Sequence, residues 1–266
     1  MSTIDTAVIK RQDFPTMVQS YQSAMAKIDQ AFTLFQEASD LLTAAFGGHN
    51  FNVAQELVYH RGQDDVKLQL RKNAWRSVLD RLEIEKVMSN KQLDETEKRF
   101  QDGKNIPEIT LDTLKEISFG LLEKAPEYAN ELFKEAYKFL MTGNNQWDHY
   151  KTNEKNARRS LGKKVILRWI VESSFGNTYS VNSYRAKDLL AVDKVFHILD
   201  GKGFPQGYRS PLLDAITTTS QSTGKGQTDY FEFQCYQNNN LHLQFKRMDL
   251  VKKLNQISGD NFSIAD

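Results

Sequence analysis

The sequence predicts a predominantly helical α+β fold, with an N-terminal helical bundle and a C-terminal β-hairpin or small antiparallel sheet flanked by helices. Two observations carry this prediction. Apolar residues in the first half recur at helical spacing, beginning with one long segment at 15–46. In the second half, apolar and polar residues alternate on both sides of a short polar turn between Asp229 and Lys246.

The segment at 15–46 is typical of one long helix whose apolar residues form a narrow seam. Pro15 suits the first helical turn, and GGHN at 47–50 ends the pattern. The seam consists of Tyr21, Met25, Ile28, Phe32, Phe35 and Leu42. One partner helix can bury a seam of this width, either from the same chain or from a second copy. Helix-mediated self-association is therefore one expected interaction.

Shorter helical patterns follow, and the first half of the chain is expected to be wholly helical. The predicted helices cover about 74–89, with 91–101 as an extension, then 110–123 and 126–141, with an interruption by DGKNIP at 102–107. We place a boundary near residue 70. Residues 1–70 then form the long helix and its connection, and residues 71–266 form the domain that carries the site.

The second half of the chain has a different character. KKVILRWIVES at 163–173 is apolar and β-branched without clear periodicity, so a strand and a buried helix both remain open. RAKDLLAVDKVFHILDGKG at 185–203 predicts an amphipathic helix that ends at Gly201. The polar run at 218–228 predicts a mobile loop, and MDLVKKLNQI at 248–257 predicts a short closing helix.

The alternating segment predicts a hairpin with one apolar face, formed by Phe231, Phe233, Cys235, Leu241, Leu243 and Phe245. QNNN at 237–240 suits the turn because asparagine tolerates positive φ. The other face carries Tyr230, Glu232, Gln234, Tyr236, His242, Gln244 and Lys246. Such an aromatic, amide and imidazole face is compatible both with the lining of a site and with an ordinary exposed face.

A basic segment at 144–168 precedes this hairpin and points to an anionic partner. Its cations are Lys151, Lys155, Arg158, Arg159, Lys163, Lys164 and Arg168, against the acids Asp148 and Glu154. The net charge of the whole chain is only +1. A local surplus of cations beside Trp147 and Tyr150 suits a nucleic acid, because phosphates pair with the cations and bases stack on the rings. A solvated helix start remains the alternative.

The composition excludes several classes of protein. With 39% hydrophobic and 26% charged residues, the chain is an ordinary globular one, and no apolar run is long enough to span a membrane. A single cysteine, Cys235, rules out an internal disulfide and fits a cytoplasmic location. The five histidines show no metal-ligand spacing, and the glycine-rich runs lack the form of a phosphate loop. We therefore expect no metal and no cofactor.

Three segments together resemble the bacterial and phage domain-of-unknown-function family numbered 4942. They are YKTN with LGKKVI, VFHILDGKGFP, and DYFEFQCYQNNNLHLQFKRMDLVKKLN, and the resemblance covers roughly residues 70–258. Two positions depart from the family pattern, since His149 separates Asp148 from Tyr150 and Asn239 replaces a turn glycine. The chain is also similar to anti-phage DNA glycosylases of the Brig type. That resemblance implies excision of glucosylated hydroxymethylcytosine from phage DNA as an antiviral defence.

Cleavage of an N-glycosidic bond needs a carboxylate near the sugar, a donor to the leaving base and a pocket for the extruded nucleotide. The candidate catalytic residues are Asp148, Tyr150, Asn153, Asn240 and His242, with Asp200 as a second candidate carboxylate. The candidate DNA-binding residues are Lys151, Arg158, Arg159, Lys163, Lys164, Lys246 and Arg247. Trp147 and Tyr236 are the candidate base-stacking residues.

Several of these residues also have structural explanations. Asp148 is placed to cap a helix that starts near Thr152, and Asp200 to close a helix at Gly201. Lys151 is instead a candidate Schiff-base nucleophile of a glycosylase-lyase. Two other functions stay open: a non-catalytic DNA-binding module that acts with a methyltransferase or nuclease, and a protein-binding inhibitor or toxin that uses the N-terminal seam.

Overall fold

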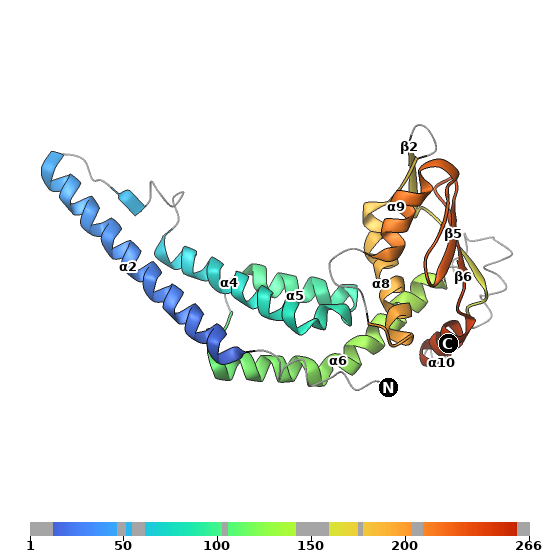
Figure 1. Cartoon of the computed structure of the whole chain (residues 1–266), viewed down its shortest axis with the longest axis horizontal. Coiled ribbons are helices and arrows are strands. Elements are labelled where there is room, and N and C mark those ends of the chain that lie inside the picture. The colour runs from blue at the N-terminus through green and yellow to red at the C-terminus, as the bar shows by residue number, and fades with distance from the viewer. Residues whose placement is uncertain are drawn as a thin grey trace. The chain divides into compact units, whose positions relative to one another are not determined.

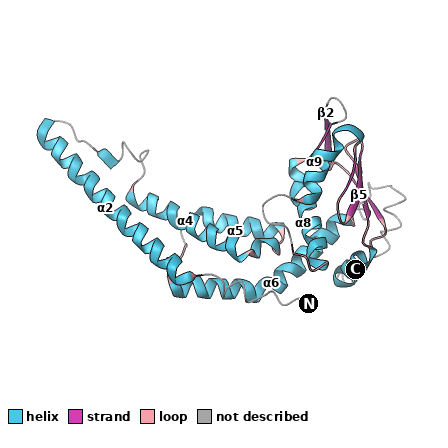
Figure 2. Ribbon diagram, viewed as in Figure 1, coloured by secondary structure: helices cyan, strands magenta, loops and turns pink. Residues whose placement is uncertain are grey.

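The computed structural model describes residues 13–46, 52–54, 62–102, 106–141, 160–174, 178–203 and 210–259. The chain divides into two compact units, one of residues 1–85 and 94–124 and the other of residues 86–93 and 125–266. Figure 1 shows the elements along the chain, and Figure 2 shows that helices predominate. The described strands belong to the second unit. The predicted fold class is therefore confirmed. The boundary proposed at residue 70 stays a prediction.

The first unit is helical. Its elements are α2 (Phe14–Phe46), α4 (Gln63–Leu82), most of η1 (Ile84–Lys86) and α5 (Asn90–Asp102), and the first part of α6 (Leu111–Leu140). Trp75 is the centre of its core, with 1% of its surface exposed, and the indole Nε1 donates to the carbonyl of Pro107 at 2.8 Å. None of the described helices is both long enough and apolar enough to cross a membrane.

Two helix predictions in this part of the chain were wrong in their bounds. The helix expected at 74–89 begins eleven residues earlier, at Gln63, and ends at Leu82 because Glu83 adopts a left-handed φ of 55°. The helices expected at 110–123 and 126–141 are one helix, α6, with Pro126 inside it. A proline removes a single backbone N–H, and α6 continues through Pro126, with Ala125 beside it fully buried.

The second unit contains a four-stranded antiparallel sheet of order β1-β6-β5-β4. The strands are β1 (Lys164–Leu167), β4 (Lys225–Gln227), β5 (Phe231–Cys235) and β6 (Leu241–Phe245). A separate two-stranded sheet pairs β2 (Val171–Ser174) with β3 (Thr178–Val181) in antiparallel fashion. Of the described helices, α8 (Ser183–Leu199), α9 (Pro211–Thr223), α10 (Met248–Gly259) and the second part of α6 complete the unit. Helices α8 and α9 lie on one side of β5 and β6 (Figure 1).

One face of the sheet is apolar and packs on α8. Phe196 is fully buried there, stacked on Phe245 with ring centroids 5.4 Å apart and edge-on to Phe231 at 4.8 Å. The apolar hairpin face predicted from the sequence is confirmed, since all six of its residues are buried. Burial also raises the pKa of Cys235 to about 12, so its thiol stays protonated at neutral pH.

The structure tests three expectations for the strands and turns of the second unit. The apolar run at 163–173 forms two strands, β1 and β2, rather than a helix. Asn239 in the hairpin turn has the expected positive φ, at 67°. The prediction of a loop at 218–228 was wrong, because those residues end α9 and form β4.

Gly224 makes this last arrangement possible. Its φ is 66°, and a Cβ there would lie 3.0 Å from the carbonyl oxygen of Cys235. The chain therefore turns sharply at Gly224 and adds β4 to the edge of β5.

Candidate functional site

The open face of the four-stranded sheet presents two rows of aligned side chains. Strand register places Lys164, Gln244, Glu232 and Gln227 across one row. It places Ile166, His242, Gln234 and Lys225 across the next row. Side chains that alternate along a strand share a face, so these polar groups project to the side away from the apolar core. Packing of the hydrophobic core does not explain why these polar side chains share one face.

Seven of the eight residues in these rows, all except Ile166, line a groove of about 460 Å³. Its walls are Lys164, Lys225, Gly226, Gln227, Glu232, Phe233, Gln234, His242 and Gln244. Sites for small ligands commonly measure roughly 300–1,000 Å³. The groove is thus large enough for a single small ligand of the size of a nucleoside.

Hydrogen-bonding groups dominate the groove. Glu232 accepts a hydrogen bond from the amide of Gln244 at 3.0 Å, which fixes both side chains. Lys164 and Lys225 carry two positive charges against the one negative charge of Glu232. Beside Gln227, Lys246 donates to the carbonyl of Thr228 at 2.7 Å. Amides that both donate and accept, with a cationic surplus, suit a flat polar ligand that carries negative charge.

His242 is the titratable group at the centre of the second row. Burial, and then the nearby charge of Lys164, lower its pKa below the usual value, so the ring is neutral at pH 7. The ring of Tyr236 lies 4.2 Å away, centroid to centroid. Nδ1 of His242 is buried and has no hydrogen-bond partner among the residues that the structure describes. A neutral imidazole can donate through one nitrogen and accept through the other.

Glu232 and His242 are diagonal neighbours on adjacent strands, because Glu232 pairs with Gln244 and His242 lies two residues before it. Diagonal pairs of this kind have a spacing of about 7–8 Å. A ligand atom between them would meet a carboxylate on one side and an imidazole on the other. Among the described residues, no cluster of three or more His, Cys, Asp or Glu side chains is arranged to hold a metal ion.

The structure brings some of the predicted site residues to this groove and not others. His242 and Lys164 line it, and Tyr236 packs on His242. Asn240 is 5% exposed within the hairpin turn, where its carbonyl accepts from the backbone N–H of Tyr236. The remaining predictions at Trp147, Asp148, Tyr150, Lys151, Asn153, Arg158 and Arg159 lie outside the described residues.

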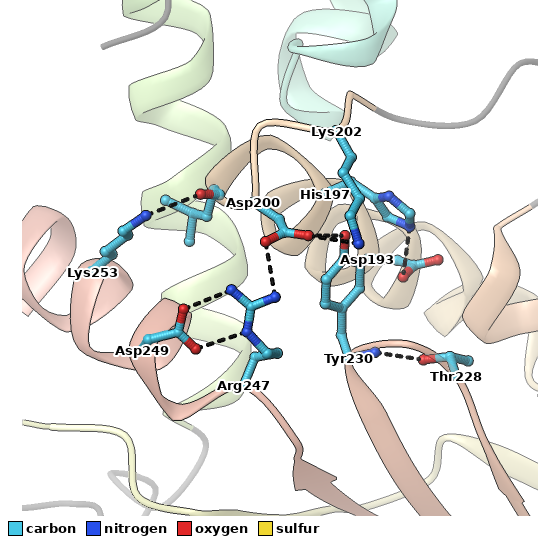
Figure 3. A network of polar contacts seen from close by, with 10 residues as sticks. Asp193, His197, Asp200, Lys202, Thr228, Tyr230, Arg247, Asp249 and Lys253 are labelled. Atoms are coloured by element: carbon cyan, nitrogen blue, oxygen red, sulfur yellow. Dashed lines mark hydrogen bonds and ion pairs between the residues drawn. The ribbon is translucent and has the colours of Figure 1, made fainter.

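Asp200, Lys202, Tyr230, Arg247 and Asp249 form a separate polar network at the end of α8 (Figure 3). The Asp200 carboxylate receives Lys202 at 3.0 Å, Arg247 at 2.9 Å and the Tyr230 hydroxyl at 3.1 Å. Its pKa is lowered, chiefly by the hydrogen bond from Lys202. Asp249 supplies the second carboxylate of this network. The guanidinium of Arg247 lowers the pKa of Asp249 to about 2.

This network favours a structural role for Asp200. Its backbone N–H closes α8 as the cap residue, and its side chain joins the helix end to the starts of β5 and α10. Arg247, predicted to bind DNA, is engaged by the two carboxylates. Lys163, which was also predicted to bind DNA, is exposed just before β1.

Tyr230 corrects one expectation for the hairpin. It was expected on the polar face, but it is 1% exposed and packs on Phe196 and His197. The alternation fails because Asp229 and Tyr230 form a bend before β5 begins at Phe231. Burial, together with the Asp200 hydrogen bond, raises the pKa of Tyr230 to about 12. Tyr230 therefore anchors the fold at this end.

Sequence reasoning missed the groove residues on β4. Lys225 and Gln227 fell in the segment expected to be a loop, so nothing aligned them with the hairpin. Glu232, Gln234 and Gln244 were placed on the correct face but were not chosen as site residues. The sequence signal that could have identified these three residues was their alternation with buried residues along β5 and β6.

The family described as "Domain of unknown function (DUF4942)" matches the chain over residues 68–263. No curated protein and no solved structure matches the chain. The match covers all the groove residues and the Asp200 network, as well as the long helix α6.

Proposed function

Since the chain belongs to this family of domains of unknown function, which assigns no activity, we propose a function from the site itself. The protein binds DNA and acts as a DNA glycosylase, holding an extruded nucleotide in the groove on the open sheet face. The base released is a modified one, and glucosylated hydroxymethylcytosine in phage DNA is the proposed target. Excision would leave abasic sites in the DNA of an invading phage.

The groove of about 460 Å³ is the observation that carries this proposal. Three glutamines can pair with the edge of a base, because each amide offers donors and an acceptor. Lys164 and Lys225 flank them and can pair with the phosphates on either side of the nucleotide. The rings of Tyr236 and His242 at one end provide a surface on which a base can stack.

The proposed chemistry uses residues that line the groove and one residue, Asp148, that comes earlier in the sequence. A carboxylate removes a proton from water, the water oxygen bonds to the anomeric carbon, and the bond to the base breaks. The base leaves with the electron pair and takes up a proton, while a donor stabilises it. Glu232 and Asp148 are the two candidates for the carboxylate. The neutral His242 can donate to the leaving base.

Incubation of the purified full chain with two DNAs tests the proposal. One DNA carries glucosylated hydroxymethylcytosine, and the other has the same sequence with plain cytosine. We expect mass spectrometry to detect the released modified base, and an aldehyde-reactive probe to detect abasic sites, in the first DNA alone. The double variant Lys164→Gln/Lys225→Gln should bind more weakly, with the salt slope reduced by about one for each lost phosphate contact.

Lys252→Gln is the matched control, because Lys252 is exposed on α10 and does not line the groove. This variant should bind and release base as the unaltered protein does. Absence of released base from both DNAs would contradict the glycosylase proposal. Salt-dependent binding without release would instead support the alternative, a non-catalytic DNA-binding module that acts with a methyltransferase or nuclease partner.

A further inference from the structure

Trp169 stands at the corner between β1 and β2 in a conformation that the fold does not explain. Its φ is 57°, in the left-handed region, and 60% of its surface is exposed. A bulky residue with positive φ is an outlier, whereas glycine adopts that conformation without a steric penalty. An indole that is mostly in solvent adds little to the core. Folding alone would therefore favour a glycine or an asparagine at this corner.

Hydrogen bonds hold the corner in place against the hairpin turn. The backbone N–H groups of Ile170 and Val171 both donate to the carbonyl of Asn239, at 3.0 and 3.3 Å. Asn182 at the start of α8 donates its backbone N–H to the carbonyl of Ile170 at 2.9 Å. Trp169 thus projects from a backbone that is fixed on both sides. Strained residues held by their surroundings in this way cluster at binding sites.

The same turn positions one end of the groove. Asn239 lies three residues after Tyr236 and three before His242, and the rings of these two residues are in contact. Trp169 follows Ile166, which pairs with His242, by three residues, so the Cα atoms of Trp169 and Ile166 are at most about 11 Å apart. Trp169 therefore lies near the end of the sheet that carries His242 and the hairpin turn.

Charge and further aromatic surface accompany the indole. Arg168, the preceding residue, is exposed, and Lys164 is the first residue of β1. Tyr184 is 90% exposed, and its backbone N–H donates to the side chain of Asn182, the residue that also binds the corner. Exposed aromatic rings among cations suit stacked bases and their phosphates.

From this arrangement we infer that Trp169 is a stacking wedge, which enters the base stack of duplex DNA while a neighbouring nucleotide occupies the groove. The inference rests on the proposed function and adds that the substrate is a duplex. Proteins that kink or open duplex DNA commonly insert a large apolar side chain between base steps. An extruded base leaves a gap in the stack, and an indole at this distance from the groove fills it.

Trp169→Ala and Trp169→Gly test the wedge in the full-length protein. The probe is a duplex with 2-aminopurine next to the modified base, because this fluorophore brightens when it is unstacked. We expect unaltered protein to raise the fluorescence severalfold and both variants to leave it unchanged. Release of base from the duplex should fall at least tenfold, whereas release from the single strand should stay within twofold. Phe119→Ala, which removes a half-exposed ring from α6, is the control.

The melting temperature separates a wedge from a structural residue. Trp169→Gly relieves the positive φ, so its melting temperature should equal or exceed that of the unaltered protein. A clear decrease, or variants that still brighten the probe and act on the duplex, would overturn the inference. If the unaltered protein binds and brightens the duplex without releasing base, the glycosylase proposal fails while the wedge stands. If it binds neither form of DNA, both fail, and a protein partner would have to account for the exposed rings.

Discussion

Glu232→Gln is expected to reduce the release of base by about 100-fold or more, while the affinity for DNA stays within about threefold. A glutamine has nearly the same shape and can still bond to Gln244, so the groove should keep its form. It cannot take a proton from water or stabilise a developing positive charge on the sugar. The effect should therefore appear in the rate at saturating DNA, measured by single-turnover assays of abasic-site formation.

Glu172→Gln is the matched control for this variant. Glu172 is an exposed carboxylate on β2, outside the groove, and it accepts a hydrogen bond from Asn182 that an amide oxygen can replace. Its activity should be unchanged. Full activity in Glu232→Gln together with its loss in Asp148→Asn would assign the carboxylate to Asp148 and would contradict the role given to Glu232.

Phe196→Ala should lower the free energy of unfolding by about 3–5 kcal/mol, the usual cost of removing a buried phenyl ring. Phe196 is fully buried and contacts Phe231 on β5 and Phe245 on β6, the two central strands of the sheet. A cavity at this position removes support from beneath the groove. Urea unfolding followed by circular dichroism measures the loss, and DNA binding should weaken in parallel.

The control for this prediction is Phe119→Ala, whose ring is 48% exposed on α6 and lies outside the core of the second unit. It should cost less than about 1 kcal/mol, because little apolar surface returns to water. A cost for Phe196→Ala as small as that of the control would mean that α8 does not support the sheet. The description of this core would then be wrong.

The elements that the sequence predicted correctly are those with strong local periodicity. The hairpin strands alternate strictly, so the burial of Phe233 and Leu243 followed from position alone. The helix before Gly201 was also predicted, and a glycine with positive φ follows its end, but its amphipathic pattern was wrong, since residues 191–197 are all buried. Local patterns of this kind depend on few distant contacts.

The parts that were missed depend on tertiary contacts. The three residues of β4 become a strand only because Gly224 turns the chain onto the edge of β5. A proline such as Pro126 normally marks a helix boundary, yet α6 runs through it into the core of the second unit. Trp169 lay in an apolar run that both a strand and a helix could have formed. The groove therefore emerged only when β1 and β4 were placed beside the hairpin.

Photo-crosslinking tests most directly whether a nucleotide occupies the open sheet face. DNA that carries 5-iodouracil at the target position would be bound at low salt, irradiated and digested, and the attached peptides identified by mass spectrometry. We predict attachment to peptides that contain β1 and its corner, or β4 to β6, with Trp169, Tyr236 and His242 as the reactive rings. Attachment confined to the helices of the first unit would contradict a nucleotide site on the sheet.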